Sequence, residues 1–340
     1  MTSRSYVTAL LGLSLLGCGV EFDPPSELKS LRVMAVQKSV PYAKPGETVD
    51  MSMLWFDGSD RAPRDVQVAW ISGCFNPPGD LFLGCGQAFA EAGAGGGGLG
   101  LPPNVTVDFG DTFSFVMPND VISSRPPPGG ALPRYGLAFI FFAACAGQLG
   151  PAPEGQLTFP LACYGPDGSA RGSADFVAGY SSVYAYEQFR NKNPVITGFR
   201  FAGADVAPSC IGAACLTTPP QSVDCAAGGP CVDACSDDGE DGCPGIDMTP
   251  VIDRASAEQD EVSKVAYGRE FTEQMWLRYY VERGGVKSDV KLVNDAVKGW
   301  NDDYSTEFRA PKQQGVMSIW AVVHDNRGGV EWARIEVGIR

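Results

Sequence analysis

Apolar and polar residues alternate in short runs along most of the chain, which is the period-two pattern of half-buried β-strands. In the first run, Leu31, Val33 and Ala35 are expected to lie on one face. β-type patterning resumes at Val262 after a long irregular stretch. The chain is therefore predicted to be all-β. The alternating runs are 31–36, 49–55, 66–70, 112–117, 176–189, 195–201, 275–281 and 286–293.

Two segments sharpen this prediction. Residues 135–146 (YGLAFIFFAACA) are apolar throughout, and their aromatic residues and flanking Gly and Pro favour a strand buried on both faces over a helix. Residues 316–324 and 330–339 alternate on either side of an Asp-Asn-Arg-Gly-Gly turn, which predicts a terminal β-hairpin. Trp320 and Trp332 are expected to fill a core or to pair across this hairpin.

Length and turn residues indicate two domains. The chain has 340 residues with 42 Gly and 26 Pro, enough for about two domains rich in turns. A polar segment ending in Pro at 191–194 precedes a new alternating run, so we expect one β-sandwich over 31–190 and a second over 191–340. Residues 204–249 hold six cysteines and many small or acidic residues, and they are predicted to form a disulfide-rich loop insert of the second domain.

Two short segments resemble immunoglobulin-like domains. Residues 45–49 (PGETV), followed by a Trp-bearing strand, are similar to immunoglobulin-like domains of bacterial surface proteins. Residues 322–329 resemble the last hairpin of the polycystic-kidney-disease-type sandwich. The resemblance implies that both predicted domains are immunoglobulin-like β-sandwiches. It does not extend to the antibody-type disulfide, because Met51 and Met53 occupy the second strand.

The first eighteen residues have the layout of an export signal. A short basic start is followed by twelve apolar residues, too few to span a membrane, and the run ends at Leu15-Leu16-Gly17-Cys18. This ending resembles the lipobox of bacterial lipoproteins, although small or β-branched residues are commoner at the position of Leu16. The resemblance implies cleavage of a signal peptide (1–17) after Gly17 and acylation of Cys18, with a lipidated tether over 18–30. Because Gly19 is not Asp, the resemblance also implies the outer membrane.

The chain has eleven cysteines, and ten remain when Cys18, the predicted lipidation site, is excluded. Export to an oxidising compartment predicts five disulfides, while a single His and the lack of any C-x-x-C pair argue against zinc. Pairing within each half leaves 45 arrangements, and local loops favour Cys74–Cys85 and Cys145–Cys163 among them. The ten cysteines are Cys74, Cys85, Cys145, Cys163, Cys210, Cys215, Cys225, Cys231, Cys235 and Cys243.

The charge balance is acidic, with 26 Lys and Arg against 40 Asp and Glu and a net charge of −14. A nucleic-acid partner is excluded on this ground, since phosphate binding needs a basic surface. Acidic residues gather in the insert, where they form either a candidate calcium site of oxygen ligands or a solvated acidic loop without metal. No other cofactor is expected. The clustered acids are Asp233, Asp237, Asp238, Glu240, Asp241 and Asp247.

Three weaker motifs have a simple structural interpretation beside a functional one. Residues 93–98 satisfy G-x-G-x-x-G, but Leu-Pro-Pro follows instead of a helix, so a flexible loop is expected. His324 has no G-x-S-x-G nucleophile to serve and is interpreted as a strand-end residue. Tyr180, Tyr184 and Tyr186 share a face that either stacks on sugars or packs at an edge.

Together these features predict a lipid-anchored, non-enzymatic module of the bacterial envelope that binds or scaffolds an envelope protein or a glycan. No catalytic residue is expected. Two alternatives stay open. One is a carbohydrate-active or other hydrolytic enzyme that uses paired carboxylates, and the other is a purely structural envelope protein.

Overall fold

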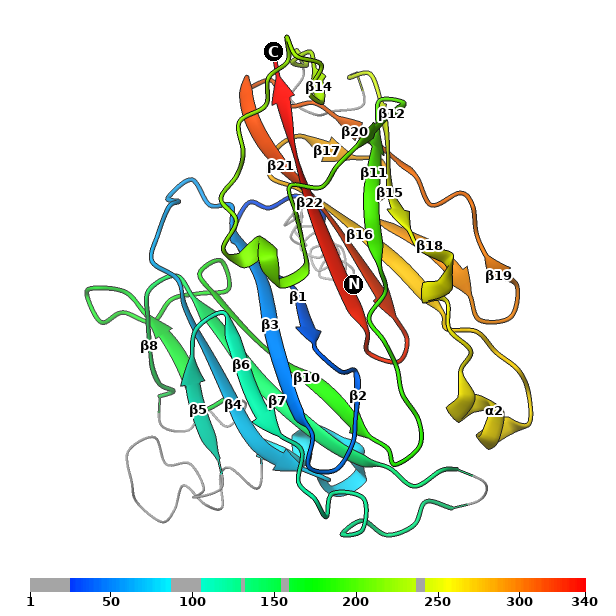
Figure 1. Cartoon of the computed structure of the whole chain (residues 1–340). Helices are drawn as coiled ribbons and strands as arrows, with labels where there is room; N and C mark the ends of the chain where they lie inside the picture. The colour runs from blue at the N-terminus through cyan, green and yellow to red at the C-terminus, as the bar shows by residue number, and fades with distance from the viewer. Residues whose placement is uncertain (1–24, 87–104, 130–131, 154–158, 237–241) are drawn as a thin grey trace, which may run out of the picture.

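Four β-sheets stack face to face in two sandwiches, the first at lower left and the second at upper right in Figure 1. The computed structural model describes residues 25–86, 105–129, 132–153, 159–236 and 242–340. The main sheets of the first sandwich use strands between Leu31 and Ala185, and those of the second use strands between Ile196 and Ile339. The all-β prediction is confirmed.

The first sandwich pairs a three-stranded sheet with a five-stranded one. The three-stranded sheet has the order β1 (Leu31–Lys38), β3 (Thr48–Asp57), β6 (Thr112–Val116). The five-stranded sheet has the order β2 (Tyr42–Ala43), β10 (Phe176–Ala185), β7 (Gly136–Cys145), β4 (Gln67–Phe75), β5 (Thr106–Phe109). A further two-stranded sheet consists of β8 (Gln148–Pro151) and β9 (Leu161–Tyr164). Taken in chain order, the first, second and fifth main strands form one sheet and the third, sixth and seventh the other, as in the immunoglobulin fold.

The second sandwich repeats this arrangement. One sheet has the order β12 (Ala204–Val206), β11 (Ile196–Phe201), β15 (Ile246–Ile252), β20 (Thr306–Arg309), β17 (Gly285–Val286). The other has the order β13 (Cys210–Ile211), β22 (Val330–Ile339), β21 (Gly315–Asp325), β16 (Met275–Val281), β18 (Val290–Asp295), β19 (Gly299–Trp300), with β14 (Cys231–Val232) also paired to β22. Both sandwiches are therefore immunoglobulin-like in strand order, and the cysteine-rich insert lies between β11 and β15 of the second.

Each sandwich has its own core, and β7 explains why one strand is apolar throughout. Alternate residues of β7, such as Ile140 and Phe142, face the core between the two sheets, while Phe139 and Phe141 face a second apolar cluster on the outer side. All ten residues of β7 are buried. The predicted strand buried on both faces is confirmed.

Five disulfides join the ten described cysteines in sequence-local pairs. Two of them, Cys74–Cys85 and Cys145–Cys163, are the local pairs favoured by the sequence, and they hold loops over the outer apolar cluster of the first sandwich. The other three close small loops in the insert: Cys210–Cys215, Cys225–Cys231 and Cys235–Cys243.

Removing the Cys145–Cys163 disulfide should destabilise the protein more than removing Cys225–Cys231. The two bridges span 18 and 6 residues, and a longer loop restricts the unfolded chain more. We expect the double alanine variant at 145 and 163 to lose about 3 kcal/mol of unfolding free energy, against about 2 kcal/mol for the variant at 225 and 231. Urea unfolding of both variants checks this, and equal losses would show that loop length is not the determining factor.

A third apolar core joins the two sandwiches. Met34, Ala35 and Leu54 from the first sandwich pack against Trp320 and Trp332 from the terminal hairpin of the second. The expectation that Leu31, Val33 and Ala35 share a face is wrong for Ala35. A β-bulge between Val33 and Ala35 turns Ala35 toward this third core, whereas Leu31 packs inside the first sandwich.

The strand signal at Val262 is also wrong, because this segment is the helix α2 (Glu261–Tyr267). Asp260 caps its N-terminus by accepting a hydrogen bond from the Ser263 backbone N–H, and Gly268 ends it in the left-handed conformation. Within the described residues, no helix has the length and apolar character needed to cross a bilayer. The described 3₁₀ segments are Pro78–Asp80, Gly212–Leu216 and Arg254–Ser256.

The first described residues are fixed to the second sandwich. The Leu28 N–H donates to the Val281 carbonyl (3.3 Å), and the Val281 N–H donates to the Ser26 carbonyl (2.9 Å). Leu28 is buried in the core between the sandwiches. The last part of the expected tether therefore packs on β16 rather than extending into solvent. The sequence-derived boundaries themselves stay predictions.

Candidate binding groove

A hollow with a volume of about 930 Å³ lies between the two sandwiches. Its walls come from the edge strands β1 and β10, from α2 and from the turn between β21 and β22. We call it the inter-sandwich groove. Its size falls in the range of ligand-binding sites, which concentrate between domains. Its aromatic lining residues are Tyr42, Tyr135, Phe142, Tyr180, Tyr184, Tyr186, Tyr267, Trp276 and His324.

The tyrosines predicted to share a face lie along one wall of this groove. Tyr180 is 44% exposed and stacks on Phe82, with ring centroids 4.4 Å apart. Tyr184 and Tyr186 stack with parallel rings, although Tyr186 lies just past the end of β10. Partly exposed aromatic rings with polar tips are typical of binding surfaces. These ring contacts within the protein agree with the packing interpretation, and stacking on sugars stays a prediction.

Tyr135 is held in place by a small polar network. Its hydroxyl donates to Asp80 (2.6 Å), and the Arg125 guanidinium lies 3.9 Å from its ring centroid and also pairs with Asp80. Burial and the Asp80 carboxylate raise the pKa of Tyr135 to about 12. The ring therefore presents a neutral hydroxyl and a fixed orientation to the groove.

A buried lysine closes one end of the groove. Lys38 is 4% exposed, and its ammonium donates to the Ser182 carbonyl at 3.1 Å. Burial lowers the pKa of Lys38 to about 8, although the Asp325 carboxylate opposes this shift. Gly328 lies beside it with a φ of +92°, a conformation that favours glycine, and a Cβ there would come within 2.7 Å of the ammonium. Lys38 thus links β1 to β10 across the groove.

The turn between β21 and β22 carries a buried ion pair. Arg327 pairs with Glu273, which is fully buried, and its guanidinium lies 5.6 Å from the ring centroid of Tyr42 in the first sandwich. Glu258 lies 3.4 Å from the same guanidinium. Asp325 accepts the N–H groups of Arg327 and Gly329 and is used by the turn itself. These contacts fix the rim of the groove.

The segment between the sandwiches is part of this joint. Asn191 is 4% exposed and donates to Asp325 (3.1 Å). Asn193 donates to the Lys38 carbonyl (2.7 Å) and accepts from the Val330 N–H (3.0 Å), so it bonds to both sandwiches. The sequence indicated only a polar linker here. Nothing local in Asn-Lys-Asn-Pro reveals partners more than 130 residues away.

His324 faces the groove without a hydrogen-bond partner for its buried Nε2 among the described residues, and it stacks on Trp276 with centroids 5.3 Å apart. Its neighbour Asp325 serves the turn, which agrees with a structural role. Burial, together with the charges of Arg278 and Lys38, lowers the pKa of His324 to about 4. The imidazole is therefore neutral at physiological pH.

We expect His324 to reduce stability in mild acid. Its pKa is lower in the folded state than the ordinary value of about 6.5, so the unfolded chain takes up the proton first as the pH falls. The neutral His324 contributes its full share of the unfolding free energy above about pH 6.5. This share, up to about 3 kcal/mol, is lost as the pH falls to about 4. Urea unfolding against pH should show a shallower acid loss for His324→Phe, which keeps the ring stack. Parallel curves for the two proteins would contradict the expectation.

Several predicted site residues lie outside the described residues: Gly17, Cys18, the Gly-rich segment 93–98, and Asp237, Asp238, Glu240 and Asp241 of the calcium cluster. Asp233 is described and pairs with Arg340 at 3.0 Å, and Asp247 lies in β15. Among the residues that the structure describes, no group of three or more His, Cys, Asp or Glu is arranged to hold a metal ion. The calcium site stays a prediction.

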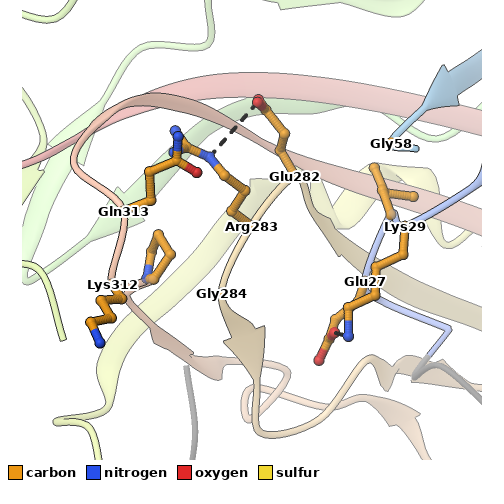
Figure 2. A pocket seen from close by; sticks show the side chains of 10 residues that line it. Glu27, Lys29, Gly58, Glu282, Arg283, Gly284, Lys312 and Gln313 are labelled. Atoms are coloured by element: carbon orange, nitrogen blue, oxygen red, sulfur yellow. Dashed lines mark ion pairs between the residues drawn. The ribbon is translucent and has the colours of Figure 1, made fainter. Parts of the chain in front are cut away.

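A smaller hollow of about 470 Å³ lies where the described chain begins (Figure 2). Figure 2 shows Glu27 and Lys29 on one side and Glu282 and Arg283 on the other. Lys29 pairs with Glu27 at 2.6 Å, and Arg283 lies 3.9 Å from Glu282. Lys312 also lines this hollow, so its charged lining consists of three bases and two acids.

Comparison with known proteins gives little further help. No protein-family model matches the chain, and no curated protein matches its sequence. Among solved structures, the tandem Ig repeats of Dlar are similar with a TM-score of 0.24 and 9% identity, over 92% of this chain and 98% of that one. The fibronectin(III)-like modules of Clostridium thermocellum CbhA are similar with a TM-score of 0.19 and 12% identity, over 90% of this chain and 93% of that one. TM-scores this low support no inference about the fold. The immunoglobulin-like assignment rests on the strand order of this chain.

Proposed function

We propose that this chain is a lipid-anchored binding module of the bacterial outer membrane, and that its ligand, an envelope protein or a glycan, occupies the inter-sandwich groove. The observation that carries the proposal is the groove itself, whose aromatic wall and fixed polar rim are typical of recognition sites. Its buried charged groups are engaged in contacts within the protein, with Arg327 on Glu273 and Lys38 on Ser182. This favours binding over acid–base catalysis.

The lipobox supports the anchoring half of the proposal. From Cys18 to Ser26 the chain has eight residues, which reach at most about 28 Å when fully extended. Because Ser26 is fixed to β16, the surface around Glu27 and Arg283 in Figure 2 would face the bilayer. The folded module would therefore act close to the membrane surface.

Photocrosslinking tests the binding half. A benzophenone amino acid in place of Tyr180, which is 44% exposed in the groove, should yield a discrete adduct with an envelope component in cells that make the lipidated protein. The matched control is the same substitution at Val297, which is 78% exposed and lies outside the groove. Adducts of equal yield and mass at both positions, or none at Tyr180, would remove the groove as the binding site.

A further inference from the structure

Strand β10 has an open edge. It pairs with β7 through ten consecutive residues, Phe176 to Ala185, without a register shift. On its other side, β2 pairs only with Tyr184 and Ala185. The rest of this edge runs beside the inter-sandwich groove, where Tyr180, Ser181 and Ser182 line the wall.

Three hydrogen bonds establish which backbone groups point out of this edge. The Ala174 carbonyl accepts from the Leu31 N–H (3.1 Å), the Ser182 carbonyl accepts from Lys38 (3.1 Å), and the Tyr186 N–H donates to Ala43 (2.9 Å). Backbone groups alternate sides along a strand, so the even-numbered residues point outward. Between Ala174 and Ser182 these are Phe176, Ala178 and Tyr180. In the part of the chain that the structure describes, their outward N–H and C=O groups have no backbone partner.

The second sandwich shows how the same chain closes such an edge. Its last strand, β22, occupies the place of β10 in the strand order, and the cysteine-rich insert covers it. Strand β13 pairs with Ala333 and Arg334, and β14 pairs with Gly338 and Ile339. In the first sandwich, β2 pairs with only two residues of β10, and no strand of the described chain pairs with the outward side of residues 176–180.

Between Phe176 and Tyr180, the open edge lacks several features that usually protect edge strands. Residues 176–185 (FVAGYSSVYA) contain no Pro, no charged residue and no bulge, and the residues beside Tyr180 are small. Natural proteins protect exposed edges with such features because a bare edge pairs with other strands. A long, unprotected and partly recessed edge is the structure that strand addition uses.

We propose that an extended peptide segment of another protein adds to the edge of β10 as a further strand, lying in the inter-sandwich groove. This proposal rests on the proposed function and names its partner class. The added strand takes its main-chain hydrogen bonds from Phe176, Ala178 and Tyr180. Its alternate side chains face Val33 and Val36 on one side and the Tyr180 ring on the other, so a segment with apolar residues at every second position fits.

The groove selects an extended segment over a second copy of this chain. The edge lies between β1 on one side and α2 and the terminal hairpin on the other. Two such recessed edges cannot approach to the 4.7–4.9 Å or so that paired strands need, whereas a single extended chain can enter.

The test uses the full chain and a displayed library of heptapeptides with Val or Ile at alternate positions. Selected peptides should slow amide hydrogen exchange at Ala178 and Tyr180, and not at exposed amides elsewhere. The variant Ala178→Pro removes one outward N–H and should weaken their binding about tenfold. The control Phe109→Pro alters β5 at the opposite edge of the same sheet, where the Phe109 N–H bonds only to its neighbour Asp108, and should leave binding unchanged.

Four results would overturn the proposal: no peptide that protects these amides, protection already present in the free chain, protection that appears only as the chain self-associates, or equal effects of the two proline variants. Circular dichroism of each variant shows that it is folded. If the Tyr180 crosslink of the proposed function persists in Ala178→Pro at full yield, the groove binds its ligand but not by strand addition. If the unaltered chain gives no Tyr180 crosslink in cells while peptides still slow exchange at Ala178 and Tyr180, strand addition holds. In that case the groove is not where the natural ligand binds.

Discussion

Replacing Arg327 by alanine should cost about 3–5 kcal/mol of unfolding free energy, the loss expected when one partner of a buried ion pair is removed. The Arg327 side chain is 3% exposed, and its partner Glu273 is fully buried, so the substitution leaves a carboxylate in an apolar environment without its cation. Apart from Arg327, the Glu273 carboxylate accepts a long hydrogen bond of 3.4 Å from the Glu258 N–H. The substitution also removes the guanidinium beside the Tyr42 ring, which connects the terminal hairpin to the first sandwich.

The control for this prediction is Arg254→Ala. Arg254 pairs with Asp302 on the surface, where both side chains are more than half exposed, and such pairs contribute at most about 1 kcal/mol. Urea unfolding of both variants at one pH gives the comparison. A similar, small effect of the two substitutions would show that the Arg327 pair is not a structural determinant. The double variant Arg327→Met with Glu273→Leu should recover part of the loss, since it leaves no unpaired charge.

Loss of the lipid should release the protein from membranes completely. The variant is Cys18→Ala with a cleavage site for the general signal peptidase after Gly17, so that export and signal removal still occur. Several acyl chains hold a protein far more firmly than one, and a net charge of −14 gives no attraction to an anionic surface. We expect the variant in the soluble fraction after cell fractionation, and the unaltered protein in the membrane pellet.

Gly19→Ala is the matched control, because it alters the neighbouring residue and keeps the acylated cysteine. Mass spectrometry of the N-terminal peptide should find the lipid on this control and on the unaltered protein. If the variant without Cys18 still sediments with membranes after a high-salt wash, the lipobox is not what anchors this chain.

Local patterns predicted the parts of the fold whose cause is local. The terminal hairpin, the fully apolar strand β7 and the short-range disulfides Cys74–Cys85 and Cys145–Cys163 all follow from periodicity or close spacing. Two expectations failed where a local pattern was ambiguous. The single extra residue of a bulge moved Ala35 to another face, and α2 begins at an Asp cap and ends at a Gly that alternation alone did not reveal.

The candidate site was predicted only in fragments. The sequence grouped Tyr180 with Tyr184 and noted His324 separately, yet their common groove requires Lys38, Tyr42 and the terminal turn beside them. Lys38 and Arg327 read as ordinary surface cations in the sequence. Only packing shows that they are buried, and that each is satisfied by a group more than 50 residues distant.

By itself, the sequence determined an all-β chain and favoured two of its local disulfides, because alternation and nearby cysteines act over short distances. The tertiary structure decided the rest: the apolar core that joins the sandwiches, the buried charges at their junction and the open edge of β10. Those features depend on which surfaces meet across the chain. A residue's neighbours in sequence do not specify them.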